Sequence, residues 1–493
     1  MVRARPRTLR VLHAAAELYP WVKTGGLGDV LAALPPALLS QGIDARLCLP
    51  AFPAFLDAFR LADAVRLATP FAAERVRVAL ATLPGSKVAA YLVDHPPFYD
   101  RPGNPYAGPD GREWPDNHRR FALLSWVAAA LGTGADPNWR PDIVHGHDWH
   151  AGLAPAYLRA EQAEGSLTAA SIFTVHNLAY HGSFAAGAFP ELSLPASFYG
   201  LEGVEFYGGV SFLKAGLAYA DRLTTVSPNY AREIQTPAFG EGFDGLLRLR
   251  ADALTGILNG VDPRYWDPEH DDAIPLGYTV ETAEAGKAAA KAELRRRLGL
   301  HEGAGPIFGV VSRLTPQKGL DLLLPALSDL VSAGGQLALL GSGDRDLEAG
   351  FAGAAAAQRG TVGVEIGYDE TLARLVIAGS DSMVVPSRFE PCGLTQLYAL
   401  RYGTLPLVRR TGGLADTVVD ATPAHLQDKI ATGFMFDAAT AEALAATLEW
   451  AIAQYANPAS WRQMVRQAMT QDFSWARSAR QYAVLYREVV SAN

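Results

Sequence analysis

Length, composition and charge limit what this chain can be. Its 493 residues exceed what one hydrophobic core usually holds, so we expect at least two domains. Apolar residues make up 49% and charged residues 19%, without a run of eighteen apolar residues, which is typical of a soluble globular enzyme and excludes a disordered or membrane-spanning chain. A formal net charge of −8 argues against a nucleic-acid partner.

Cysteine usage and the start of the chain predict a cytoplasmic protein. Cys48 and Cys392 are its two cysteines, which excludes a disulfide framework and fits a reducing compartment. The first residues are basic, but His13 and Glu17 interrupt the apolar stretch that a signal peptide needs.

Short apolar runs alternate with longer helix-like segments along the chain. Such runs indicate parallel strands buried on both faces of a doubly wound α/β sheet. The predicted strands are residues 9–15, 141–147, 170–177, 221–227, 306–313, 335–343, 381–388 and 404–410.

A glycine turn follows the first predicted strand. Its sequence, TGGLGDV at residues 24–30, returns as TGGLADTV at residues 411–418, and both copies precede a helical pattern. At such a turn, Gly25 and Gly26 let the backbone approach a ligand, and free N–H groups at the helix start attract anions. Alternatively, the paired glycines only close tight strand-to-helix turns.

The segment HGHDWHAG at residues 145–152 places three histidines and an aspartate close together. They could form a metal cluster, although Asp148 stands one position early for the binuclear metallohydrolase signature. The other hypothesis is a sugar site, in which Asp148 binds hydroxyls and Trp149 offers a stacking face. His176 and Asn177 end the next predicted strand and could join that site, or His176 could be a hydrogen-bonded core histidine.

The alternation breaks at residues 259–285, which are rich in Pro, Asp and Tyr, and a charged helix follows. We expect a domain boundary there, giving an N-terminal domain over residues 1–259 and a second domain over residues 260–472.

Two cations follow the first predicted strand of the second domain. Arg313 ends the strand, and Lys318 precedes a helix expected to begin near Gly319. Two cations beside a helix start at the carboxyl end of a parallel sheet are a plausible pyrophosphate clamp. Alternatively, they are a solvated pair on an ordinary loop.

SRFEPCGLTQLYAL at residues 387–400 has the same placement at a strand end. Glu390 can accept hydrogen bonds from sugar hydroxyls, and the helix start after Gly393 and Thr395 offers N–H groups to phosphate. The alternative is that Glu390 only caps its helix.

A last helix is predicted over residues 473–493, where Ser474 can act as the cap. Its apolar positions recur every three or four residues, and a surface of the first domain could bury them. These positions are Trp475, Ala479, Tyr482, Tyr486 and Val489.

Taken together, the motifs resemble those of the bacterial glycogen synthases and plant starch synthases over nearly the whole chain. KTGGLGDV, HDWH, TVHN, GILNGVD, SRLTPQKG, RFEPCGLTQLYAL and TGGLADTV occur in that family's order and at its spacings. The resemblance implies two Rossmann-like doubly wound domains, the GT-B glycosyltransferase fold, with an interdomain active-site cleft. LGSGDRD fits the same pattern and assigns Asp344 and Asp346 to a strand-end turn, not to a metal-binding DxD motif.

The resemblance also implies an activity. The enzyme would transfer glucose from ADP-glucose to the non-reducing 4-OH of an α-1,4-glucan such as glycogen, with retention at the anomeric carbon, and release ADP. The N-terminal domain would take the acceptor and the second domain the nucleotide sugar. We expect no cofactor and no metal, because Arg, Lys and helix ends supply the positive potential. The oligomeric state is left open.

Motif matching implies the residue roles. Arg313 and Lys318 would stabilise the leaving diphosphate, and Glu390 would contact the donor glucose. Asp148 and His176 would lie near the transferred sugar and complete the catalytic set. The substrate-binding set would be Lys23, Gly25, Gly26, Asp29, Trp149, Asn177, Asn259, Cys392, Gly393, Leu394 and Thr395.

Tyr398 departs from the wider fold class, in which many retaining relatives carry a second glutamate eight residues after the first. Three other functions remain to be weighed: a catalytically silent glucan-binding protein, a pyridoxal-phosphate-dependent glycogen phosphorylase, and a metallohydrolase. The first would lack the charged set that is present here, and no lysine marks a pyridoxal phosphate site. Metal analysis would decide on the third.

Overall fold

The computed structural model describes residues 8–492, which divide into two compact units. The first unit runs to Gly260 and includes the segment from Trp475 onward, and the second is Val261–Ser474. In the described range, no helix combines the length and apolar character needed to cross a membrane.

The first unit is built on a sheet that is parallel except at one edge. The order is β12-β11-β7-β6-β1-β2-β5-β4-β3, and the pairings of β4 with β5 and of β3 with β4 are antiparallel. Its strands are β1 (Arg10–Ala14), β2 (Asp44–Pro50), β3 (Leu61–Thr69), β4 (Ala72–Thr82), β5 (Ala89–Asp94), β6 (Ile143–His147), β7 (Ala170–Val175), β11 (Arg222–Thr225) and β12 (Leu254–Gly256). A small antiparallel sheet contains β8 (Ser183–Ala185), β10 (Gly209–Ser211) and β9 (Glu205–Phe206).

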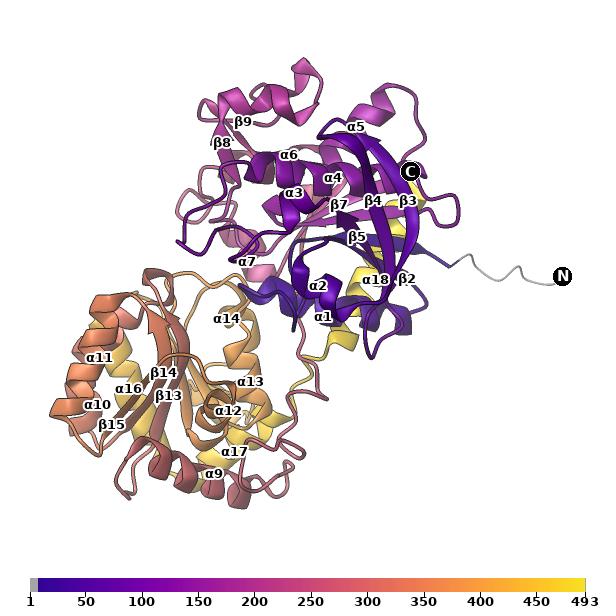
Figure 1. Cartoon of the computed structure of the whole chain (residues 1–493). Coiled ribbons are helices and arrows are strands. Elements are labelled where there is room, and N and C mark those ends of the chain that lie inside the picture. The colour runs from indigo at the N-terminus through magenta and orange to yellow at the C-terminus, as the bar shows by residue number, and fades with distance from the viewer. Residues whose placement is uncertain (1–7, 493) are drawn as a thin grey trace. The chain divides into compact units, whose positions relative to one another are not determined.

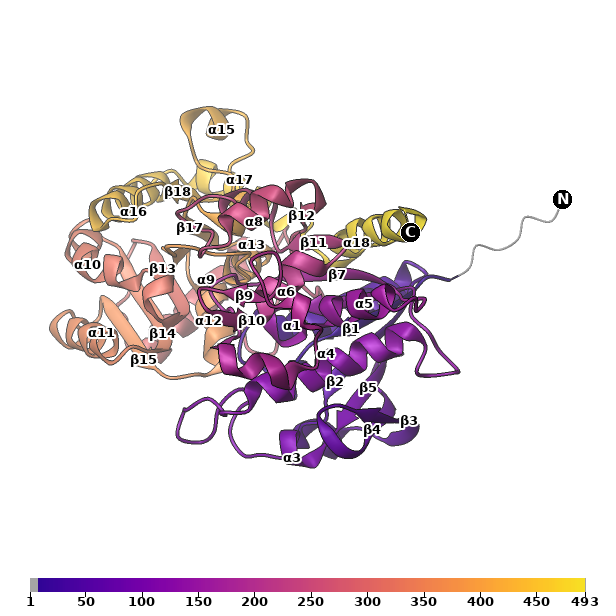
Figure 2. The same ribbon diagram turned by 90° about the horizontal axis from the view of Figure 1, so that it is seen from above.

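Helices cover this sheet. They are α1 (Gly26–Ser40), α2 (Pro53–Ala58), α3 (Pro96–Tyr99), α4 (Asn117–Thr133), α5 (Ala154–Ala163), α6 (Phe212–Tyr219), α7 (Pro228–Glu233), α8 (Asp244–Leu249) and α18 (Trp475–Ala492). Although α18 is the last element of the chain, it packs on α1, and Figures 1 and 2 both show it beside the first unit. Its apolar stripe, from Trp475 to Val489, is buried in the core of that unit.

The second unit has an entirely parallel sheet, in the order β15-β14-β13-β16-β17-β18. Figure 1 shows helices on both of its faces, and α9 packs on α12 as α10 packs on α16. The strands are β13 (Ile307–Leu314), β14 (Gln336–Gly343), β15 (Val362–Ile366), β16 (Ser382–Val385), β17 (Leu405–Arg409) and β18 (Phe434–Phe436). The helices are α9 (Ala283–Leu298), α10 (Leu323–Ser332), α11 (Arg345–Ala357), α12 (Glu370–Gly379), α13 (Thr395–Arg401), α14 (Gly412–Thr417), α15 (Pro423–Gln427), α16 (Ala441–Tyr455) and α17 (Pro458–Met469).

Every strand predicted from the sequence is present, and the doubly wound α/β fold is confirmed. Asp344 accepts hydrogen bonds from the N–H groups of Asp346 and Leu347 and so caps α11 at the end of β14. The sequence analysis missed the antiparallel edge. No residue of β3 is buried, and in β4 the charged residues Glu74, Arg75 and Arg77 interrupt the apolar pattern, so neither strand reads as a buried parallel strand over its whole length.

Candidate functional site

A pocket of the second unit lies at the carboxyl ends of β13 and β16. Its volume is about 150 Å³. Parallel strands all end at the same sheet edge, so side chains that follow neighbouring strands meet there. The lining residues include Ser312, Arg313, Lys318, Ser387, Glu390, Gly393, Leu394 and Thr395.

Lys318 and Glu390 form an ion pair in this pocket, with 2.6 Å between Nζ and Oε2. Ser387 donates a hydrogen bond of 2.8 Å to the same oxygen, and Glu390 is 5% exposed. The α13 helix begins at Thr395 without a side-chain cap. The alternative that Glu390 caps its helix is therefore wrong.

A helix begins directly after Gly319, as predicted, but its first turn is 3₁₀. Another 3₁₀ turn ends at Lys318, Gly319 adopts φ +66°, and the 3₁₀ turn Leu320–Leu322 leads into α10, which begins at Leu323. A Cβ on Gly319 would lie 2.1 Å from the carbonyl oxygen of Pro386. Glycine therefore lets this turn pack against the end of β16, which brings Lys318 to Glu390.

Arg313 lies beside this ion pair and is exposed. Its guanidinium has no hydrogen-bond or ion-pair partner among residues 8–492. The pocket thus combines a neutralised lysine with an arginine that is available to an anion.

The second glycine turn supports the pocket by packing. Gly413 donates its N–H to the carbonyl oxygens of Glu390 and Pro391, at 3.0 and 3.1 Å. A Cβ added to Gly412 would lie 1.9 Å from the carbonyl oxygen of Glu390. A Cβ added to Gly413 would lie 2.2 Å from the carbonyl oxygen of Cys392. For this copy the structure supports the alternative that the glycines close a tight turn.

Cys392 is buried beside Glu390 and takes part in no disulfide within the described residues. Gln396 donates from Nε2 to the carbonyl oxygens of Cys392 and Gly393, at 2.9 and 3.0 Å. Gly393 has φ +73°, a conformation that favours glycine. These contacts fix the backbone between Glu390 and α13.

The first glycine turn holds a carboxylate of the protein itself. The N–H groups of Thr24 and Gly25 donate to Oε2 of Glu17 at 2.8 and 3.2 Å, and the Tyr106 hydroxyl donates to Oε1 at 2.6 Å. Glu17 therefore occupies the amides of Thr24 and Gly25, and the expected anion site stays a prediction for the N–H groups at the helix start from Gly26 onward. The hydrogen bonds from Thr24 and Tyr106 lower the pKa of Glu17 although burial opposes them, so it is ionised at neutral pH.

Lys23 and Asp29 lie on either side of this turn. Lys23 Nζ is 2.8 Å from Asp29 Oδ2, and Lys23 is 41% exposed. Gly26 is the first residue of α1. Asp29 thus orients Lys23, while Glu17 orders the backbone that connects them.

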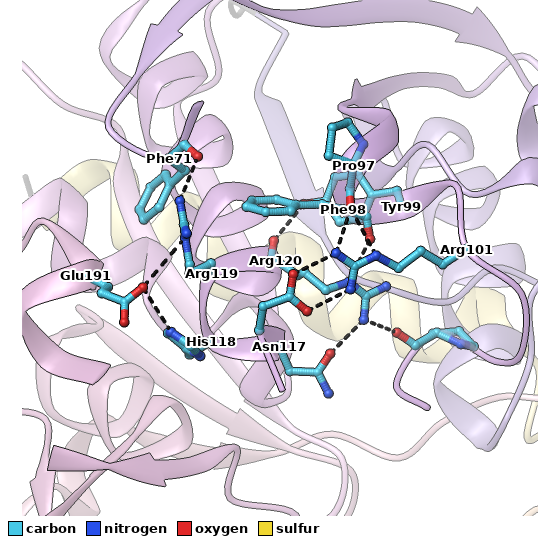
Figure 3. Close-up of polar contacts among 12 residues, drawn as sticks. Phe71, Pro97, Phe98, Tyr99, Arg101, Asn117, His118, Arg119, Arg120 and Glu191 are labelled. Carbon is cyan, nitrogen blue, oxygen red and sulfur yellow. Dashed lines mark hydrogen bonds and ion pairs between the residues drawn. The ribbon is translucent and has the colours of Figure 1, made fainter. Parts of the chain in front are cut away.

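The loop that carries Tyr106 is anchored by a buried arginine, shown in Figure 3. Arg120 donates to the carbonyl oxygens of Phe98 and Pro105 at 2.7 and 3.0 Å, and to Asn117 Oδ1 at 2.6 Å. The sequence did not predict that Glu17, Tyr106 and Arg120 act together, because they come from segments far apart in the chain. The feature that could have indicated the site was Glu17, an acidic residue shortly after a buried strand.

Asp148, His176 and Asn177 meet where β6 and β7 end. Asp148 Oδ1 accepts from the backbone N–H groups of His176 and Asn177 at 2.7 and 3.4 Å. Asp148 is buried and has φ +53°. Burial raises its pKa to about 7, so this carboxyl group can change its charge near neutral pH.

Trp149 is packed among aromatic side chains. Its ring makes an edge contact with Phe121 at 4.8 Å, and a Cβ on Gly182 would lie 2.4 Å from the ring. The backbone of Gly182 therefore covers one face of the indole, and Trp149 is half-buried.

The histidines of this region bond to one another and not in the grouping expected for a metallohydrolase. Nitrogen atoms of His13, His145 and His147 lie within 4.8 Å of one another. His13 contacts His147, whereas His145 contacts the Tyr486 hydroxyl and Thr174. All of these ring nitrogens except Nε2 of His13 are thus engaged in hydrogen bonds, and His13 was not foreseen from the sequence.

Asn259 and Tyr398 occupy contrasting environments. Asn259 is 6% exposed, and its Oδ1 has no hydrogen-bond partner among the described residues, so it offers a buried acceptor. Tyr398 stacks on Trp266 with 3.7 Å between ring centroids. The position that is a glutamate in many retaining relatives is thus occupied by an aromatic stack.

Comparisons with known proteins agree on the family. A family model for the starch synthase catalytic domain matches residues 10–249, and one for glycosyl transferases group 1 matches residues 291–468. A glycogen synthase of Francisella tularensis subsp. novicida is 50% identical over 488 residues, covering 98% of this chain and 100% of the relative. One of Francisella philomiragia is 50% identical over 485 residues, with the same coverage.

Solved structures agree on the fold. The catalytic domain of starch synthase IV from Arabidopsis thaliana, bound to ADP and acarbose, superposes with a TM-score of 0.85 at 32% identity, over 98% of this chain and 100% of that one. A sucrose-phosphate synthase from Thermosynechococcus elongatus gives 0.58 at 17% identity, over 99% and 100%, and supports the fold alone. The architecture is that of the GT-B glycosyltransferases.

Proposed function

This chain belongs to the glycogen and starch synthase family of glycosyltransferases, and we propose that its donor is ADP-glucose. It would transfer glucose to the non-reducing 4-OH of an α-1,4-glucan, retain the anomeric configuration and release ADP. The starch synthase IV structure bound to ADP and acarbose supports a nucleotide and a glucan as ligands.

The observation that carries this proposal is the pocket in which Arg313, Lys318 and Glu390 meet. Breaking a glycosyl–phosphate bond leaves extra negative charge on the diphosphate. Preorganised cations at that position stabilise the transition state more than the ground state. Arg313 is the available cation, and Lys318 can contact a phosphate while it holds Glu390 in place.

Retention needs either a carboxylate nucleophile or attack on the same face. Glu390 is the one acidic residue among the described residues that line the pocket, and Lys318 and Ser387 both donate hydrogen bonds to its Oε2. A glycosidase-like pair of acids is not assembled there. We therefore favour a front-face reaction, in which the departing phosphate oxygen takes the proton of the acceptor hydroxyl. The bond from the anomeric carbon to ADP then breaks as the bond to the 4-oxygen forms.

The direct test is to incubate the protein with glycogen and either ADP-glucose or UDP-glucose, with and without EDTA, and to measure the released nucleotide. We expect glycogen-dependent ADP release that is insensitive to EDTA. Faster release of UDP would contradict the proposed donor. Activity lost on chelation and restored by a divalent ion would contradict the metal-free clamp.

Arg313→Ala tests the clamp. We expect a loss of about 1.5–3 kcal/mol in transition-state stabilisation, or roughly ten- to a hundredfold in kcat/KM, with an unchanged melting temperature. The matched control is Arg345→Ala, which removes an exposed arginine outside the pocket. Lys318→Ala does not separate catalysis from stability, because it also leaves the buried Glu390 carboxylate without its cation and should destabilise the fold.

A further inference from the structure

A row of buried histidines lies behind His176. Nδ1 of His13 is 3.0 Å from Nε2 of His147, and Nδ1 of His147 is 2.9 Å from Nε2 of His176. His13 lies on β1, His147 ends β6, and His176 follows β7. His13 and His147 are completely buried, and His176 is half-buried.

These rings are neutral at neutral pH. Burial lowers the pKa of His13 and of His176 to about 3, and it lowers the pKa of His147 well below its ordinary value. A neutral imidazole carries one N–H and one bare nitrogen. Each nitrogen–nitrogen contact needs an N–H on one ring and a bare nitrogen on the other, so all the hydrogen bonds of the row must run in one direction. The rings donate either outward, from His13 toward His176, or in the reverse direction, from His176 toward His13.

The inner end of the row selects the direction. Nε2 of His13 is enclosed, and it has no hydrogen-bond partner among residues 8–492. In the reverse direction this nitrogen would carry a buried N–H without an acceptor. In the outward direction this nitrogen carries only an unused lone pair. Buried N–H groups without a partner are rarer in proteins than buried acceptors without a partner, so the outward direction is favoured.

The outer end of the row is open. Nδ1 of His176 is not among the enclosed nitrogens, and it has no partner in the described part of the chain. His145 stacks on His147 at 4.3 Å but takes no part in the row, because its nitrogens contact Tyr486 and Thr174. The outward direction therefore places an N–H of His176 where a ligand can meet it.

We propose that His13 and His147 are positioning residues that hold the proton of His176 on Nδ1, so that this ring donates a neutral hydrogen bond to an oxygen of the transferred sugar. The identity of the ligand rests on the proposed function. A neutral donor suits a sugar ring that becomes positive in the transition state, because an imidazolium beside it would repel that charge.

The tautomers can be read directly. Protein labelled with ¹⁵N-histidine and kept free of ligand at pH 7.5 is studied by long-range ¹H–¹⁵N correlation. We expect His176 and His147 to be protonated on Nδ1 and bare on Nε2. A proton on Nε2 of His176, or a doubly protonated ring, would overturn the proposal.

His147→Asn and His147→Asp form a matched pair of nearly equal shape. The asparagine amide can keep an N–H near the position of Nδ1, whereas the aspartate offers only acceptors and draws the His176 proton to Nε2. We expect the Asn variant to retain kcat within about threefold, and the Asp variant to lose about tenfold or more with a smaller change in the donor KM.

Equal turnover of the two variants, together with a shifted His176 proton in the Asp variant, would refute the role of the tautomer. If the Asp variant does not fold, the wild-type spectrum decides by itself. The spectrum needs no substrate, so a protein that fails to release ADP from ADP-glucose would refute the proposed donor and leave the tautomer assignment to be judged separately.

Discussion

At the scale of single residues, Glu17 is the group whose chemistry most depends on its neighbours. It is 3% exposed, and its carboxylate accepts hydrogen bonds from Thr24, Gly25 and Tyr106. An ionised carboxylate suits this site because it has acceptor capacity for all of these donors and no N–H to oppose them. Glu17 thus orders the turn from which Lys23 projects.

Glu17→Gln should disorder that turn. The amide NH₂ of glutamine would face donors, and we expect a loss of about 1–3 kcal/mol in unfolding free energy together with a lower kcat. Tyr106→Phe removes one donor and should cost about 1 kcal/mol. Urea unfolding and ADP release would measure both effects, with Glu74→Gln on the exposed side of β4 as the control. A fully stable and active Glu17→Gln enzyme would show that the turn orders itself.

At the scale of elements, the start of α14 supports the segment that carries Glu390. A Cβ on Gly413 would lie 2.2 Å from the Cys392 carbonyl oxygen and 2.5 Å from its Cα. These are backbone atoms, so relief requires the Glu390–Cys392 segment to shift.

Gly413→Ala should therefore lower the unfolding free energy by about 2 kcal/mol or more, and weaken catalysis because Glu390 moves. Gly353→Ala is the matched control: it lies in α11 with nothing within 4 Å of the added Cβ, and we expect it to stabilise by up to about 1 kcal/mol. Thermal melts and ADP release would separate the two. Similar behaviour of both variants would contradict the packing role.

At the scale of the whole molecule, the last helix completes the core of the first unit. Tyr486 of α18 is completely buried, and its hydroxyl lies 2.8 Å from Nδ1 of His145 on β6. Tyr486→Phe should lower the unfolding free energy by about 1–3 kcal/mol, because a buried imidazole nitrogen loses its partner. Hydrogen exchange should quicken in α1 and β6 but not in β13–β18, and the exposed Tyr368→Phe should change neither. Uniform quickening in both units would contradict this local effect.

The buried histidines also predict how stability depends on pH. The pKa of His13, His145 and His147 is lowered by burial in the folded state, so each stabilises fully above its unfolded pKa near 6.5 and loses that contribution as the pH falls toward the folded value. At pH 5 His13 alone costs about 2 kcal/mol, and His145 and His147 add losses in the same direction.

Asp148 acts in the opposite direction. Its folded pKa is raised to about 7, so protonation between pH 7 and 5 returns about 2 kcal/mol. The loss of unfolding free energy from the buried histidines exceeds the gain from Asp148, so we expect the first unit to lose net stability between pH 7 and 5. Urea midpoints at these two pH values would measure it, and an unchanged or higher midpoint at pH 5 would show that the histidines are charged or solvated in the folded protein.

The sequence by itself determined the parallel α/β architecture, the family and the identity of the charged groups of the second unit. Buried parallel strands are local patterns of apolar residues. Arg313 lies at the end of such a strand, and Lys318 and Glu390 lie in the segments that follow β13 and β16. Residues that follow neighbouring parallel strands meet at one sheet edge, so their meeting in one pocket follows from position alone.

Only the tertiary structure decided what each polar group contacts. The amides of the first glycine turn hold Glu17, the glycines of the second turn pack on the Glu390 segment, and His13 extends a row that ends at His176. These contacts join segments far apart in the chain. Two nearly identical glycine turns acquired different roles because hydrogen bonding and burial are set by the neighbours that the fold supplies, which no local pattern encodes.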